Sequence, residues 1–143
     1  MKNPFKRDFD RYDGVRPINI WLLRLLFVLV FLFVGWDSWG AIIKHQGPWD
    51  HVRAAAMCMW AAYSLLSIIG VFYPLKMLPL VLFEILYKIV WLIIVAYPLW
   101  AANKLAGSPA EEMTKTFLWV VLPIVATPWK YVFDHYILNR KST

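Results

Sequence analysis

The sequence predicts an all-α integral membrane protein, an up-down four-helix bundle. Three observations support this prediction: 61% of the 143 residues are hydrophobic, the mean hydropathy is positive, and the apolar residues gather in four long blocks. Soluble domains are usually about 45–50% apolar, and about 20 apolar residues in a helix cross the hydrocarbon core of a bilayer. Backbone groups inside a bilayer must bond within the chain, so each block is expected to be a helix.

The first apolar block covers residues 18–43 and follows a basic tail at residues 1–17. A cleavable signal peptide is the alternative for this block, because Ser38 and Gly40 could mark a cleavage site. Signal peptides have apolar regions of about 7–15 residues, which is shorter than this block. The sequence therefore favours an uncleaved first helix.

Short links rich in glycine and proline separate the four blocks. Such links place neighbouring helices antiparallel, which is the reason for expecting an up-down bundle. Prolines inside the last block are expected to bend it, because proline removes a backbone donor. The expected spans are about 18–43, 52–73, 76–100 and 113–138, followed by a tail at 139–143; the links hold Gly47-Pro48, Pro74 and Gly107-Ser108-Pro109, and the bending prolines are Pro123 and Pro128.

The distribution of basic residues predicts a multi-pass protein of the cell membrane, such as a bacterial-type inner membrane, with both termini in the cytoplasm. Cytoplasmic ends of membrane proteins carry the excess of lysine and arginine. The net charge of +6 indicates membrane lipid as a partner rather than nucleic acid, for which no recognition motif is present. On the cytoplasmic side we expect Lys2, Lys6, Arg7, Arg11, Arg16, Lys76, Lys130, Arg140 and Lys141, and on the other side Lys44, Arg53, Lys104 and Lys115.

Two charged residues, Glu84 and Lys88, lie in the middle of the third block. A charge near the bilayer centre costs roughly 2.5–3.5 kcal/mol on insertion scales, so these residues need compensation. They are one helical turn apart in the order that favours an ion pair. Arg24 of the first block can reach Glu84 if the two helices are neighbours; the alternative is that Arg24 extends to the membrane surface.

Two interpretations of this group remain open. In the first, the pair is structural: it neutralises itself and orients the helices. In the second, it lines a polar pocket that binds a lipid-like or quinone-like molecule. The residues of the expected pocket are Arg24, Glu84, Tyr87, Lys88 and Trp91.

A second polar group is expected near the outer ends of the first two spans. Its members are Asp37, His45, His51 and Arg53. Histidine and aspartate are metal ligands, but these residues lack the compact spacing of a metal site, so we expect none. Cys58 is the only cysteine, which excludes an internal disulfide.

Two stretches of the chain carry a family resemblance. Leu22-Leu23-Arg24-Leu25, continuing to Phe31-Leu32-Phe33-Val34-Gly35-Trp36, resembles the first helix of DoxX-like membrane proteins. Gly70-Val71-Phe72-Tyr73-Pro74-Leu75-Lys76 is similar to the second link of that family. The resemblance implies a four-helix bundle associated with membrane redox complexes, often as a non-catalytic subunit.

The leading hypothesis is a small accessory or ligand-binding subunit of a membrane complex, with quinone or lipid as its ligand and other membrane subunits as partners. The alternative is a proton-coupled transporter or channel in which Glu84 carries protons. The chain is short for a transporter, so this alternative requires a homo-oligomer. An enzyme is disfavoured and no catalytic residue is assigned, because no nucleophile stands beside a base.

Overall fold

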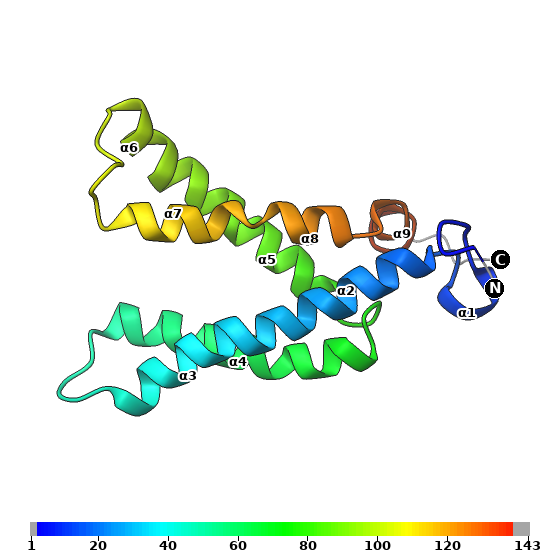
Figure 1. Cartoon of the computed structure of the whole chain (residues 1–143), viewed down its shortest axis with the longest axis horizontal. Coiled ribbons are helices and arrows are strands. Elements are labelled where there is room, and N and C mark those ends of the chain that lie inside the picture. Colours follow the sequence, from blue (N-terminus) through cyan, green and yellow to red (C-terminus); the bar gives the residue numbers. More distant parts are fainter. Residues whose placement is uncertain (1–2, 139–143) are drawn as a thin grey trace.

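The computed structural model describes residues 3–138, and its apolar blocks are helical (Figure 1). In this part of the chain, three helical segments are long and apolar enough to cross a membrane, and a bent pair of helices is a fourth candidate. The all-α class is therefore confirmed, and the helices are consistent with a multi-pass membrane protein. The segments are Pro17–Lys44, His51–Phe72, Leu78–Ala101 and the pair Ala110–Ala126 and Trp129–Ile137. The expected tail at 139–143 and the basic residues Lys2, Arg140 and Lys141 lie outside the described residues.

Each segment is built from α-helices, and three of the four also contain a π turn. A π turn bonds each amide to the carbonyl five residues back, so the helix continues through it with a local bulge. In chain order the elements are α1 (Phe9–Tyr12), α2 (Pro17–Leu29), η1 (Val30–Val34), α3 (Gly35–Lys44), α4 (His51–Phe72), α5 (Leu78–Trp91), η2 (Leu92–Ala96), α6 (Tyr97–Ala101), α7 (Ala110–Leu118), α8 (Val121–Ala126), α9 (Trp129–Val132) and η3 (Phe133–Ile137).

The first two segments form an antiparallel hairpin that is closely packed at two glycines. The ring of Phe27 in α2 lies directly on Gly70 of α4, where a Cβ atom would be 2.5 Å from the ring. Further along, Gly35 of α3 lies against Ser64 of α4. Small residues let membrane helices approach closely, so these two positions set the distance between the helices of this hairpin.

The third and fourth segments form a second antiparallel hairpin. The link between its two segments contains Gly107, whose amide donates a hydrogen bond of 2.7 Å to the carboxylate of Glu111 in α7. Glu111 also forms an exposed ion pair with Lys115, at 2.9 Å. Deeper in the hairpin, the ring of Phe117 in α7 contacts the aromatic side chains of α5 and thereby joins the two segments.

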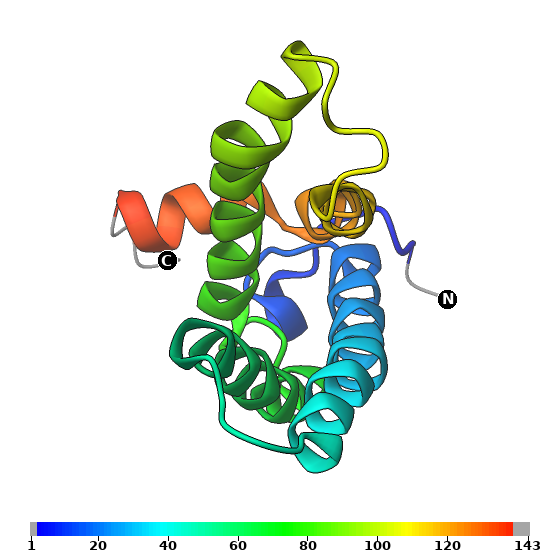
Figure 2. The same ribbon diagram turned by 90° about the vertical axis from the view of Figure 1, so that its left-hand side faces the viewer.

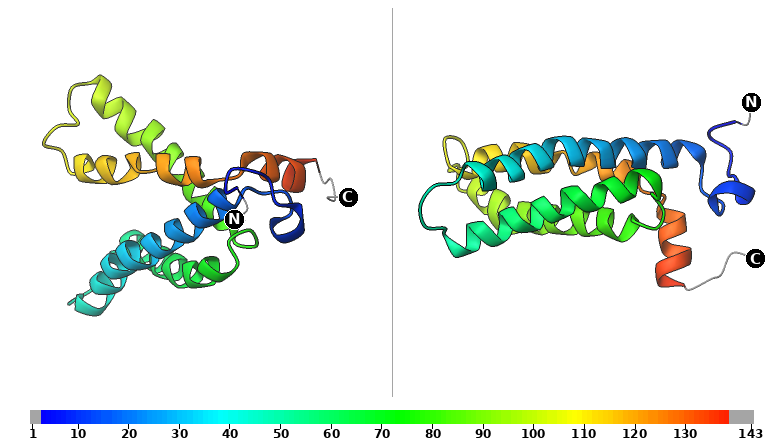
Figure 3. Two further views of the ribbon diagram at one scale, coloured as in Figure 1. Left: turned by 45° about the vertical axis from the view of Figure 1, so that its right-hand side comes forward. Right: turned by 90° about the horizontal axis from the view of Figure 1, so that it is seen from below.

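The two hairpins meet at one end and diverge towards the other, as the views in Figure 1 and the left panel of Figure 3 show. Seen from the diverging end, the four segments occupy four corners in sequence order (Figure 2). The joined end holds the main apolar cluster and also α1 and α9. The sequence predicts an up-down four-helix bundle, and the structure shows two antiparallel hairpins that are joined at one end and open at the other. Buried members of the cluster are Leu23, Leu26, Phe27, Leu78, Val81, Ile85, Val120, Ala126 and Val132.

The fourth segment is bent rather than a single straight crossing over 113–138. Its two helical parts meet at an angle of 76°. The bend lies at Pro128, which has no amide hydrogen to continue the helix and forces Thr127 into an extended conformation. The freed carbonyl of Ala126 accepts a hydrogen bond of 3.1 Å from the side chain of Asn19 in α2. The bend predicted at Pro128 is confirmed, and it ends the straight part of the segment at Ala126, whereas Pro123 lies inside α8 and is not the site of this bend.

The contact between Phe27 and Gly70 makes a stability prediction. In Gly70→Ala the new methyl group would overlap the Phe27 ring, so we expect a loss of about 1–3 kcal/mol in stability, as for overpacking in general. The melting temperature in detergent measures this loss of stability. Adding Phe27→Leu to the Gly70→Ala variant should restore part of the loss. Gly40→Ala is the matched control, since a Cβ there has no neighbour within 4 Å. Equal melting temperatures for the two alanine variants would contradict the described packing.

Candidate functional site

The centre of the protein holds a buried ion pair between Glu84 and Lys88 of α5. The ammonium nitrogen of Lys88 lies 2.5 Å from Oε1 of Glu84. Only 2% of Glu84 and 9% of Lys88 is exposed. Both residues face the interior because the i, i+4 spacing places them on the same side of the helix. The sequence-based expectation of a buried, mutually neutralising pair agrees with this geometry.

The second carboxylate oxygen of Glu84 is held by Tyr63 of α4. The Tyr63 hydroxyl donates a hydrogen bond of 2.5 Å to Oε2, and Tyr63 itself is 5% exposed. This bond joins the first hairpin to the second near the point where they separate. Sequence reasoning missed Tyr63, although its neighbours gave a signal: Ser64 and Ser67 complete a short polar stripe in an otherwise apolar block.

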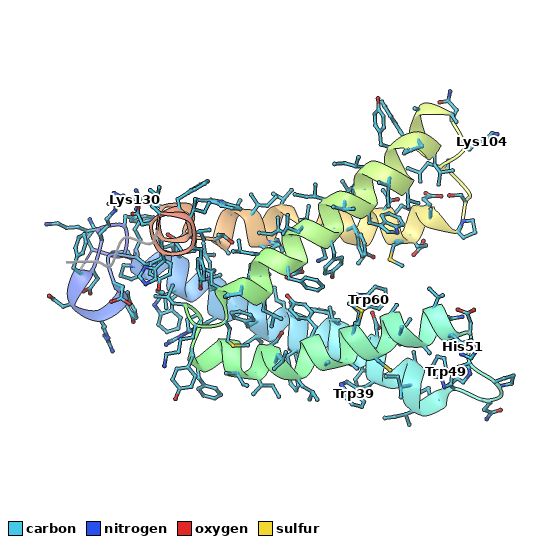
Figure 4. The ribbon with its side chains drawn as sticks, turned by 180° about the vertical axis from the view of Figure 1, so that it is seen from behind. Trp39, Trp49, His51, Trp60, Lys104 and Lys130 are labelled. Carbon is cyan, nitrogen blue, oxygen red and sulfur yellow. The ribbon has the colours of Figure 1, made fainter. Side chains whose placement is uncertain are left out.

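Aromatic residues cover one side of the ion pair. Tyr87 and Trp91 each meet the ring of Phe117 edge-on, with ring centres 5.6 and 5.0 Å apart. The Lys88 ammonium lies 6.0 Å from the centre of the same Phe117 ring. Trp60 of α4 points into this region from the other hairpin (Figure 4). The structure therefore brings Glu84, Tyr87, Lys88 and Trp91 together, as expected, and adds Phe117 and Trp60.

The ion pair has unused hydrogen-bond donors, whereas both of its carboxylate oxygens already accept a bond. Both carboxylate oxygens of Glu84 are occupied, one by Lys88 and one by Tyr63. A lysine ammonium has three donors, and within residues 3–138 Lys88 uses one of them, on Glu84. Lys88 can thus donate two further hydrogen bonds to an acceptor beside the aromatic rings. Both carboxylate oxygens of Glu84 already accept a hydrogen bond.

Arg24 does not join this group. Its guanidinium lies over the ring of Trp21, one turn earlier in α2, at 5.5 Å from the ring centre. Its Nε atom is buried without a hydrogen-bond partner in the described part of the chain. The expectation that Arg24 reaches Glu84 is therefore wrong in this structure, because Tyr63 and Lys88 already occupy the carboxylate.

The expected outer polar group is dispersed. Within residues 3–138, no hydrogen bond or ion pair links the side chains of Asp37, His45, His51 and Arg53 to one another. The ring of His45 stacks on Trp49 with centres 3.5 Å apart, and His51 begins α4 at the far end of the hairpin (Figure 4). Asp50 caps this helix by accepting the Arg53 amide at 2.8 Å, so this polar stretch serves the helix start. Among the described residues, no cluster of three or more potential metal ligands occurs.

Comparisons of the chain with known protein families, with curated proteins and with solved structures gave no match. The resemblance to DoxX-like proteins is therefore carried by the quoted stretches alone.

The burial of the ion pair makes a prediction about Glu84. In Glu84→Gln the Lys88 ammonium loses its counter-charge, and breaking a buried pair in this way costs about 3–5 kcal/mol. We expect a large drop in melting temperature in detergent, and recovery in Glu84→Gln/Lys88→Met. Glu111→Gln is the matched control, because Glu111 and Lys115 have the same spacing on an exposed surface; little change is expected there. Similar melting curves for both glutamine variants would show that the Glu84 pair is not buried.

The bond between the hairpins makes a separate prediction about Tyr63. Tyr63→Phe removes one hydrogen bond to a charged acceptor, worth about 1.5–3 kcal/mol. A double-mutant cycle with Glu84→Gln isolates the contribution of this hydrogen bond to stability. The stability lost in Tyr63→Phe should be smaller when the acceptor is no longer charged. Tyr97→Phe serves as the control, because Tyr97 is 63% exposed. Strict additivity of the Tyr63 and Glu84 changes would contradict a direct bond.

Proposed function

We propose that this protein is a multi-pass membrane protein and a non-catalytic, ligand-binding accessory subunit of a membrane complex. Its ligand is a quinone-like molecule, which binds between the two hairpins against Lys88. One observation carries this proposal. Among the described residues, two of the three N–H donors of the Lys88 ammonium have no acceptor, and the ammonium lies beside a group of aromatic rings. A ring that carries carbonyl oxygens satisfies both features: the oxygens accept from Lys88, and the ring packs on Phe117, Tyr87 and Trp91.

The apolar surface supports the membrane part of this proposal. Large hydrophobic side chains remain exposed along all four segments, including Trp36 at 80% and Trp100 at 65%. Soluble monomers rarely expose large contiguous apolar patches. A surface of this kind fits acyl chains, or the helices of other subunits, and gives an apolar ligand a route to the site from within the bilayer.

The lack of a reactive group supports a binding role rather than catalysis. In the described part of the chain, Glu84 is bonded at both oxygens, and no nucleophile stands beside a base there. Quinone reduction or oxidation would need an electron carrier in a partner subunit. The chain therefore positions the molecule, and a partner supplies the redox chemistry.

Proton conduction is the second candidate, and one observation favours it. Tyr63, Glu84 and Lys88 form a continuous hydrogen-bonded chain across the two hairpins. Such chains of ionisable groups in membrane segments serve as proton relays in pumps and transporters. A homo-oligomer would supply the second half that transporters of this kind need.

One experiment separates these candidates. The protein is purified gently from membranes, and the apolar molecules that co-purify are extracted and identified by mass spectrometry. We expect quinone to be enriched over the bulk lipid, and to fall about tenfold in Glu84→Gln/Lys88→Met, which removes the donors without leaving a lone charge. Lys115→Met is the control. Equal quinone content in the parent and the double variant would refute the quinone site, and proton flux in liposomes that Glu84→Gln abolishes would establish the second candidate instead.

A further inference from the structure

A polar pocket of about 570 Å³ lies at the joined end of the two hairpins, away from the buried ion pair. Its walls come from both ends of the chain: the α1 region, the start of α2, the bend at Thr127 and Pro128, and α9 with η3. Figure 1 and the right panel of Figure 3 show α1 and α9 at this end, beyond the ends of the long helices. The pocket lies where the apolar segments end, which is the level of the headgroups in a bilayer.

Specific contacts of the fold build this pocket. Asn19 holds the carbonyl of Ala126 and so fixes the corner from which α9 turns away. The rings of Tyr131 and His135 stack with centres 4.4 Å apart and form one wall. On the other side, Asp8 and Val15 pair through a backbone hydrogen bond of 3.3 Å, which folds α1 back towards the start of α2. The pocket is therefore a consequence of the bend and of this fold-back together.

The charges that line the pocket have both signs. Three cationic side chains, of Arg7, Arg16 and Lys130, face the same space as the carboxylates of Asp13 and Asp134. In the part of the chain that the structure describes, no ion pair or hydrogen bond joins any of these five side chains to another. Charges of opposite sign around one cavity without mutual pairing are suited to a ligand that itself carries both a negative and a positive group.

We propose that this pocket binds the phosphoethanolamine headgroup of a phospholipid. The phosphate lies against the arginine and lysine side chains, with which phosphate oxygens form charge-assisted hydrogen bonds. The primary ammonium lies against Asp13 and Asp134, to which it donates hydrogen bonds. Trp129, which lines the pocket and is 39% exposed, is the kind of aromatic side chain that meets headgroups at a membrane surface. The proposal depends on insertion in a membrane, but not on the quinone site.

The two carboxylates distinguish this headgroup from the other common ones. An anionic glycerol headgroup has no cation for Asp13 and Asp134, so it leaves them beside a phosphate. A choline headgroup has a positive charge but no N–H donor for the carboxylates. The ethanolamine headgroup alone of the three supplies a phosphate and a hydrogen-bonding ammonium.

Lipid binding to the full-length protein, measured by native mass spectrometry, tests the proposal. The probes are phosphatidylethanolamine, phosphatidylglycerol and phosphatidylcholine with identical acyl chains. We expect the parent to bind the ethanolamine lipid about tenfold more tightly than either of the others. Asp134→Asn should remove most of this preference, because one charge-assisted hydrogen bond corresponds to about a tenfold change in affinity. Lys130→Gln should weaken all three lipids, because the phosphate is common to them.

Matched variants and a soluble competitor complete the test. Lys104→Gln changes a lysine at the opposite end of the molecule, as Figure 4 shows, and should alter none of the affinities. Asp13→Asn repeats the Asp134 test on the other wall of the pocket. Tighter binding of phosphatidylglycerol than of phosphatidylethanolamine by the parent would overturn the proposal. Displacement of the lipid by an equal concentration of free phosphoethanolamine would overturn the lipid as the source of the headgroup.

Discussion

The structure depends on one electrostatic constraint: a carboxylate and an ammonium lie in the middle of an apolar helix. Placing either charge alone in a low-dielectric interior costs several kcal/mol. The chain meets this cost locally, with Lys88 one turn from Glu84, and then at long range with Tyr63. Because Tyr63 belongs to the other hairpin, satisfying the carboxylate also fixes how the two halves of the protein lie against each other.

The helices and the charged pair were accessible to sequence reasoning, because each depends on residues close together in the chain. The apolar blocks give helix positions to within a few residues, Pro128 gives the bend, and the i, i+4 spacing gives the pair. Tyr63 was not accessible in this way. Whether a hydroxyl on α4 reaches a carboxylate on α5 depends on the rotation and tilt of two helices, and the sequence does not specify either.

The same reasoning explains the errors. Arg24 and Glu84 lie at similar depths in their helices, but depth alone does not bring two side chains together, and Arg24 lies instead on Trp21. The up-down bundle was expected because the links are short. Helices that are apolar nearly all round carry little information about which face packs inward. Short links place neighbours side by side, and they do not determine whether two hairpins close along their whole length.

The bend at Pro128 has a consequence for the surrounding bilayer. The part of the fourth segment before this bend, Ala110–Ala126, extends over about 25 Å at 1.5 Å per residue, whereas a hydrocarbon core is about 30 Å thick. The first segment, Pro17–Lys44, exceeds that thickness. In a bilayer of average thickness the fourth segment would therefore be too short, and the first segment, which packs beside it through α2 and α8, would be too long. In the membrane setting proposed above, lipid would thin beside the fourth segment, which would give the molecule a preferred tilt and favour thinner membranes.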